Sequence, residues 1–199
     1  GLLSVKSESG ICKVICFSPE HNLTLPKMKV SAIEKIIFLW QKEYNELSVN
    51  PAIKYIQIFE NKGEIMGCSN PHPHGQIWSS SSIPLELVKE TSQQKNYFDK
   101  HKTSLLSDYL QLELRKNERI VVENEHFVAL VPFWAIWPYE TMIVSKRHVQ
   151  HIMQFNALER LSFATILKQL STKYDNLFNI SFPYSAGMHQ SPVNSGSFP

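Results

Sequence analysis

Two histidines separated by a single residue are the part of this sequence most suited to chemistry. They lie in the string Cys68-Ser69-Asn70-Pro71-His72-Pro73-His74-Gly75-Gln76. In an extended strand, residues i and i+2 point to the same face, so we expect both imidazoles and the amide of Gln76 to face one pocket. The prolines fix φ and remove two backbone donors, which excludes a helix, and Gly75 lets the backbone approach a ligand. A lone His-x-His is weak evidence for a site, whereas the nine-residue string is far more specific.

His74 is the candidate nucleophile. An imidazole is largely unprotonated near neutral pH and can attack phosphorus, forming an N–P bond labile enough to pass the group onward. The attacking ring needs its other nitrogen held by an acceptor, and the sequence does not identify that partner. The amide of Gln76 cannot donate a net proton, but it can hydrogen-bond a phosphoryl oxygen. The predicted chemistry is a two-step transfer through His74 with ping-pong kinetics.

Strands and helices must position these residues. An apolar stripe after Ser31 predicts a helix that Ser31 and Glu34 cap, and Asn156 with Glu159 predicts a second capping box. The stripe is expected to be core and consists of Ile33, Ile36, Ile37, Trp40, Tyr44 and Leu47. The polar segment 89–117 is expected to be helical and peripheral, and Asn61-Lys62-Gly63 to be a hairpin-type turn. Strands are predicted at 12–17, 55–59, 120–122, 127–131, 141–145 and 178–182, and the His-Pro-His string is predicted to be a further strand.

The two halves of the chain share an order of elements. A strand ending near His21 precedes an amphipathic helix and a second strand, and a segment ending near His148 precedes the same arrangement. We therefore predict an internal duplication, with one unit at residues 1–88 and the other at 89–199. The alternative is a chance likeness between two α+β halves. The equivalent of the His72–His74 pair would fall at or just beyond Pro199.

Composition narrows the classes of function. The net charge of +2 is too small to argue for a nucleic-acid surface. No apolar run approaches the roughly 20 residues of a membrane span, and three cysteines do not form a disulfide framework. We expect a reducing cytoplasmic compartment, with no nucleic-acid or membrane partner. Because the chain starts at Gly1 and finishes in a loose tail, we expect an internal fragment.

Around the His-Pro-His string the sequence resembles the galactose-1-phosphate uridylyltransferases of the histidine-triad-like superfamily. The similar segments cover nearly the whole chain and are residues 14–21, 59–63, 67–78 and 181–185. The resemblance implies an α+β fold of two histidine-triad-like units, each an antiparallel sheet or half-barrel with packed helices, here truncated at both ends. It also implies exchange of UMP between UDP-glucose and galactose 1-phosphate through a uridylyl-histidine intermediate. A homodimer is expected.

The resemblance also suggests roles for individual residues. It implies that His74 is the nucleophile. It implies contacts to the nucleotide sugar at Asn61, Gly67, Cys68, Ser69 and Gln76. Structural zinc would be bound by His21 and His72 with an upstream cysteine pair that this chain lacks. A second metal, zinc or iron, would be bound by Glu90 and His189 with ligands beyond Pro199. Two ligands alone do not complete a tetrahedral site, which leaves zinc binding open.

Two other functions remain open at this point. Nucleotide hydrolases of the related type place a third histidine at the position of Gln76, so this amide argues against a hydrolase or a phosphorylase. The second alternative is a non-enzymatic protein. In that case the isolated chain folds poorly or only binds a partner.

Overall fold

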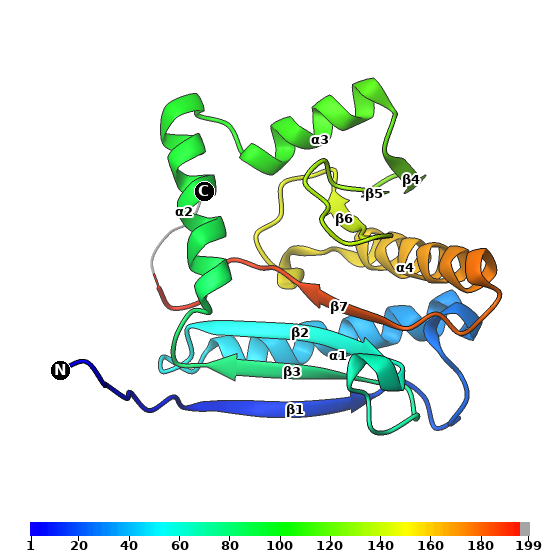
Figure 1. The fold of residues 1–199 in the computed structure, drawn as a ribbon, viewed down its shortest axis with the longest axis horizontal. Coiled ribbons are helices and arrows are strands. Elements are labelled where there is room, and N and C mark those ends of the chain that lie inside the picture. Colours follow the sequence, from blue (N-terminus) through cyan, green and yellow to red (C-terminus); the bar gives the residue numbers. More distant parts are fainter. Residues whose placement is uncertain (196–199) are drawn as a thin grey trace.

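The computed structural model describes residues 1–195, in which two antiparallel sheets combine with four α-helices (Figure 1). This confirms the expected α+β class. The first sheet has the order β1 (Gly10–Cys16), β3 (His74–Ser80), β2 (Tyr55–Lys62), β7 (Tyr184–Met188), and the second joins β4 (Ile120–Glu123), β5 (Phe127–Leu130) and β6 (Met142–Ser145). The helices are α1 (Val30–Ser48), α2 (Leu85–His101), α3 (Leu105–Lys116) and α4 (Ala157–Phe178). Three 3₁₀ turns complete the elements, namely η1 (Leu25–Lys27), η2 (Glu64–Met66) and η3 (Ile152–Gln154).

The register of the first sheet brings distant parts of the sequence together. Strand β3 lies between β1 and β2, so that Gln76 is opposite Phe59, and His74 is opposite Cys16. Strand β7 pairs with the other edge of β2, which places Ser185 opposite Asn61. The histidine string therefore ends in a central strand that is hydrogen-bonded on both sides.

One face of this sheet is the core face. The stripe on α1 is buried as predicted, and it packs against Ile56, Ile58 and Ile77 of the sheet and against Phe163 and Ile166 of α4. Burying large aliphatic side chains contributes roughly 1.5–3 kcal/mol each. Because strand side chains alternate, the residues between those isoleucines point to the opposite, open face. That face carries Gln76 and Trp78.

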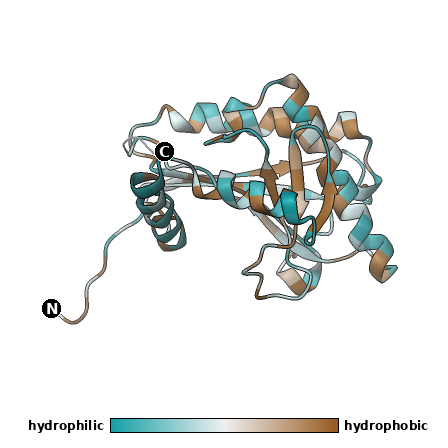
Figure 2. Ribbon diagram, turned by 90° about the horizontal axis from the view of Figure 1, so that it is seen from above, coloured by the Kyte–Doolittle hydropathy of each residue, from teal (hydrophilic) through white to brown (hydrophobic). Residues whose placement is uncertain are grey.

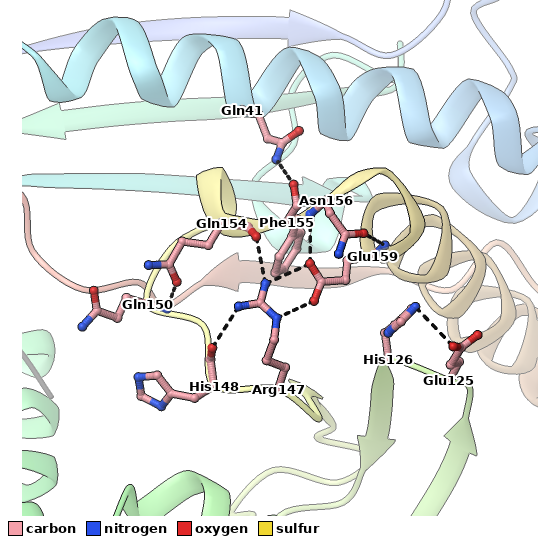
Figure 3. Close-up of polar contacts among 10 residues, drawn as sticks. All are labelled: Gln41, Glu125, His126, Arg147, His148, Gln150, Gln154, Phe155, Asn156 and Glu159. Carbon is pink, nitrogen blue, oxygen red and sulfur yellow. Dashed lines mark hydrogen bonds and ion pairs between the residues drawn. The ribbon is translucent and has the colours of Figure 1, made fainter.

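Polar contacts join the two halves at the start of α4 (Figure 3). The predicted capping box is confirmed, with Asn156 and Glu159 bonding each other's backbone N–H groups. Glu159 also accepts two bonds from Arg147, at 2.7 and 2.9 Å. From α1, the Gln41 amide donates to the carbonyls of Ile152 and Phe155 at 2.8 and 3.0 Å. These contacts fix the loop before α4 against α1.

Four local predictions were wrong. Ser31 is not a cap, because α1 begins at Val30 and Lys29 is its N-cap residue. Strand β2 continues through Lys62, so the turn starts at Gly63 instead of Asn61. The predicted strand at 178–182 is instead the end of α4, an αL residue at Asn179 and a loop. The string before His74 is irregular, and β3 begins only at His74.

The division into units at residue 88 stays a prediction. Residue 88 lies inside α2, and β7 from the C-terminal part joins the first sheet. Helix α2 is mostly hydrophilic, with Leu87 its one buried residue, and it lies peripherally as expected (Figure 2). Among residues 1–195, no helix is both long and apolar enough to cross a bilayer. The end of the predicted tail, including Pro199, lies outside the described residues.

Candidate active site

His74 opens β3 at the point where the irregular string joins the sheet. The string is tied to β1 by the backbone N–H of Phe17, which donates to the carbonyl of Pro73 at 2.9 Å. Within the string, the backbone N–H of His72 donates to the side-chain oxygen of Asn70 at 3.0 Å, as in an Asx turn. Pro71, Pro73 and this turn fix the backbone of the string before His74, although it lies in neither a helix nor a β-sheet. His74 is therefore presented from a fixed end of a central strand.

The ring of His74 is held in one tautomer. Its Nδ1 lies 2.8 Å from the carbonyl oxygen of His72. A carbonyl can only accept, so Nδ1 carries the hydrogen and the neutral ring keeps its lone pair on Nε2. This carbonyl is the acceptor partner that the sequence left unidentified. In this tautomer, Nε2 is the atom through which His74 can act as a nucleophile.

Gly75 is glycine for a packing reason. A Cβ built on this residue would lie 3.0 Å from ring carbons of Phe17 and 3.2 Å from the carbonyl oxygen of Phe59. The residue is buried on the core face, between His74 and Gln76. The missing side chain makes room for Phe17, and approach of a ligand to the backbone of Gly75 stays a prediction.

Two amides lie on the face opposite the core. Gln76 follows His74 by two residues on β3, and Asn61 lies on the neighbouring β2. The hydroxyl of Ser185 on β7 is 2.6 Å from Asn61 Oδ1, and the indole nitrogen of Trp78 is 3.1 Å from Gln76 Oε1. Neutral amides are suited to bind phosphoryl oxygens because they offer N–H donors without charge.

The other predicted substrate contacts lie in the exposed connection between β2 and β3. Gly67 has a φ of +79° and closes the turn η2, with its N–H donating to Glu64 at 2.9 Å. Its conformation, in the left-handed region, is what requires glycine. Cys68 is half-buried, with its thiol 3.1 Å from the carbonyl of Asn70, and Ser69 is exposed. Their contacts to substrate stay a prediction.

The structure brings the four predicted metal ligands together as two separate pairs. The Nδ1 atoms of His21 and His72 are 2.8 Å apart, and the carboxylate of Glu90 lies 2.9 and 3.0 Å from Nδ1 of His189. This hydrogen bond raises the pKa of His189. Imidazole and carboxylate are suitable donors for zinc or iron. Among residues 1–195, however, no three such side chains gather at one point. Each pair fits half of a tetrahedral site.

Two family models match successive parts of the chain. The model described as "Galactose-1-phosphate uridyl transferase, N-terminal domain" matches residues 1–84, and the corresponding C-terminal domain matches residues 90–197.

The chain belongs to the galactose-1-phosphate uridyl transferase family.

Relatives in this family are similar along the whole chain. The galactose-1-phosphate uridylyltransferase of Saccharomyces cerevisiae is 52% identical over 98% of the chain, and that of Haemophilus influenzae is 51% identical over 93%. Those matches cover 54% and 52% of the relatives, so the chain spans about half of their length.

Two solved structures share the fold of this uridyl transferase family member. A uridylyltransferase mutant has a TM-score of 0.88 at 26% identity, covering 92% of this chain and 60% of its own. An ADP-glucose phosphorylase from Arabidopsis thaliana, solved with ADP-glucose, has a TM-score of 0.85 at 26% identity, covering 94% and 58%.

This family member also holds buried charges beneath the site, which sequence reasoning missed. Glu60 and Lys62 flank Asn61 on β2 and point to the core side, where Glu60 accepts from the Tyr184 hydroxyl at 2.7 Å. Lys62 pairs with Asp175 of α4 at 3.3 Å. Burial raises the pKa of Glu60 to about 7, against the lowering effects of Tyr184 and Lys62. In the sequence, the signal for these buried charges was the alternation Glu60-Asn61-Lys62 at the end of a buried strand.

Proposed function

We propose that the protein transfers a uridylyl group between UDP-glucose and galactose 1-phosphate. The single observation that carries this proposal is the hydrogen bond from His74 Nδ1 to the carbonyl of His72, 2.8 Å long. It leaves Nε2 as a nucleophile in a chain whose relatives are named galactose-1-phosphate uridylyltransferases. A surface histidine without such an acceptor would interconvert between tautomers.

In the first half-reaction, Nε2 of His74 attacks the α-phosphorus of UDP-glucose. An N–P bond forms and the bond from that phosphorus to the bridging oxygen breaks, so glucose 1-phosphate leaves with the electron pair. In the second half-reaction, a phosphate oxygen of galactose 1-phosphate attacks the same phosphorus, the N–P bond breaks, and UDP-galactose forms. Throughout, Nδ1 of His74 keeps its hydrogen and donates it to the carbonyl oxygen of His72, which stabilises the positive charge on the uridylylated ring.

Gln76 and Asn61 would stabilise charge on the phosphoryl oxygens. Both are uncharged donors on the open face, and the loss of one such donor in other enzymes costs about 10²–10³-fold in rate. Neither can protonate a leaving group. This favours transfer to a second sugar phosphate over proton-assisted hydrolysis.

Zinc or iron at the two ligand pairs is part of the proposal. His21 with His72, and Glu90 with His189, would each supply two ligands, and further ligands would complete each site. Metal analysis of the purified protein tests this, because His21→Ala should remove one metal without affecting the other. Homodimer formation and a cytoplasmic location also stay predictions.

A phosphorylase is the second candidate, favoured by the likeness to the ADP-glucose phosphorylase at a TM-score of 0.85. The two activities differ in their acceptor. Product analysis with UDP-glucose or ADP-glucose, and with galactose 1-phosphate or inorganic phosphate, separates them. UDP-galactose formation supports the transferase, whereas sugar 1-phosphate release that depends on inorganic phosphate and ADP-glucose supports the phosphorylase.

Intact mass after incubation with UDP-glucose is the direct test. The chain should gain one uridylyl group, His74→Gly should gain none, and the exposed His148→Gln control should react like the unsubstituted chain. The same three proteins should also be prepared as chimeras in which these 199 residues replace the matching segment of the Saccharomyces cerevisiae relative. No adduct in either setting would overturn the covalent mechanism.

A further inference from the structure

Trp78 has an unusual place on the sheet. It lies two residues beyond Gln76 on β3 and points to the same open face, while Ile77 between them is buried in the core. Its side chain is 53% exposed. The indole meets the ring of Phe59 edge-on, at a centroid distance of 5.4 Å and an interplanar angle of 86°. Core packing therefore does not account for a tryptophan here.

The contact between Trp78 and Gln76 fixes the direction of the amide. The indole Nε1 is 3.1 Å from Oε1 of Gln76. An indole N–H can only donate, so the amide atom that it meets must be the carbonyl oxygen. The amide nitrogen then points away from the indole with both hydrogens available. In the described part of the chain, no other side chain bonds Gln76.

Without this contact, the side-chain amide of Gln76 can rotate by about 180° and exchange the positions of its oxygen and nitrogen. Its oxygen and nitrogen are similar in size, and the flipped form would present an acceptor to an anionic phosphoryl group. Asn61 offers a comparison, since its partner Ser185 lies 2.6 Å away. A hydroxyl can donate or accept, so that contact permits either orientation. Of these two contacts, only the one from the Trp78 indole fixes the orientation of the amide that it meets.

We infer that Trp78 is a positioning residue for uridylyl transfer, holding the Gln76 amide with its N–H donors toward the phosphoryl oxygens at His74. This rests on the proposed function. Trp78 does not touch the reacting atoms and acts only through Gln76. Trp78→Phe keeps an aromatic ring against Phe59 and removes the N–H. Replacing Trp78 by β-(3-benzothienyl)alanine, in which sulfur replaces the N–H, keeps both rings and controls for lost packing.

A double-mutant cycle on the rate of adduct formation tests the dependence on Gln76. Gln76→Leu should slow the reaction about 10²–10³-fold, as for loss of an oxyanion donor. Trp78→Phe should slow it about 10-fold, because part of the amide population stays correctly oriented. The loss should fall on the rate at saturating UDP-glucose. In the Gln76→Leu background, Trp78→Phe should have no further effect, since the contact is already gone.

A second measurement needs no activity. The chain has four tryptophans, so four indole N–H resonances are expected in a ¹H–¹⁵N spectrum. Trp78→Phe identifies the resonance of Trp78 by its loss. Gln76→Leu should move this resonance upfield and speed its hydrogen exchange, leaving the other three in place.

The outcomes separate this inference from the proposed function. If neither the chain nor its chimera forms an adduct, but the Trp78 resonance responds to Gln76→Leu, the contact is retained and the transferase is contradicted. An unchanged resonance overturns the inference whatever the activity. Equal slowing by Trp78→Phe in both backgrounds also overturns it, because Trp78 would then act on the fold alone. The inference is also overturned if Trp78→Phe and the benzothienylalanine variant both form the adduct at the rate of the unsubstituted chain.

Discussion

Replacing Glu60 by glutamine should make the stability of the protein less dependent on pH. The side chain of Glu60 is 8% exposed and accepts a hydrogen bond from Tyr184 at 2.7 Å. Glutamine has the same shape and keeps an acceptor for that hydroxyl, but it does not ionise. The substitution therefore removes the titration of one buried carboxyl and disturbs the packing little.

The expected size follows from the pKa of Glu60, which burial raises from 4.5 to about 7. A carboxyl with a raised pKa binds its proton more tightly in the folded state. Its contribution to stability is complete below pH 4.5 and is lost as the pH rises through about 7. Between pH 5 and pH 8 the loss is about 2.5 kcal/mol by linkage. For a chain of this length this corresponds to roughly 5–10 °C in Tm.

Urea unfolding of both proteins at several pH values measures this difference. As the pH rises from 5 to 8, the free energy of unfolding of Glu60→Gln should increase by about 2.5 kcal/mol relative to that of the unsubstituted chain. Glu64→Gln is the control, because Glu64 lies exposed in η2 and its replacement should leave the pH dependence unchanged. Parallel curves for Glu60→Gln and the unsubstituted chain would refute the reasoning, as they would place the Glu60 carboxyl in water.

Three further substitutions test packing and hydrogen bonding by urea midpoint. Gly75→Ala should destabilise the fold by about 1–3 kcal/mol, because the new methyl overpacks Phe17, and an unchanged midpoint would show that the ring has room to move. Gln41→Met should cost about 2 kcal/mol, because it removes both hydrogen bonds of the amide and leaves the part-buried Phe155 carbonyl without this donor. A smaller loss would mean that water replaces the amide. Arg147→Met should cost about 2 kcal/mol, because it leaves the Glu159 carboxylate without its cationic partner, while solvent at the partly exposed site screens some of the loss. Arg147→Lys should recover part of this stability. Equal losses for the Met and Lys variants would contradict a role for the charge.

Local patterns predicted most of the elements. The stripe on α1 has a 3.6-residue period and is buried, and the capping box of Asn156 and Glu159 forms as its spacing indicates. Predictions failed at the ends of elements. A strand was predicted at 178–182, but α4 continues to Phe178 and is capped by Asn179 in a left-handed conformation at φ 52°. There, the helix and its cap outweigh the local preference of the aromatic residues for strands.

The candidate site was only partly predictable. His74 and Gln76 stood out because their types and spacing lie within one short segment. The hydrogen bond to the His72 carbonyl depends on a backbone turn that periodicity does not specify. Ser185 reaches Asn61 only because β7 pairs with β2, and a register between such distant strands is a tertiary property. The sequence offered no signal for Trp78, since a tryptophan two residues after a glutamine has no signature of its own.

The pairing of β7 with β2 also has a consequence for synthesis on the ribosome. Glu60 and Tyr184, which bond each other across this pair, are 124 residues apart in the chain. At roughly 5–20 residues per second, about 6–25 s pass before β7 emerges, and during that time β2 has an open edge. The nascent chain thus exposes unpaired backbone groups and the uncovered side chains of Glu60 and Lys62. Chaperone binding should therefore be strongest at intermediate chain lengths and decline once residues 184–188 have been released.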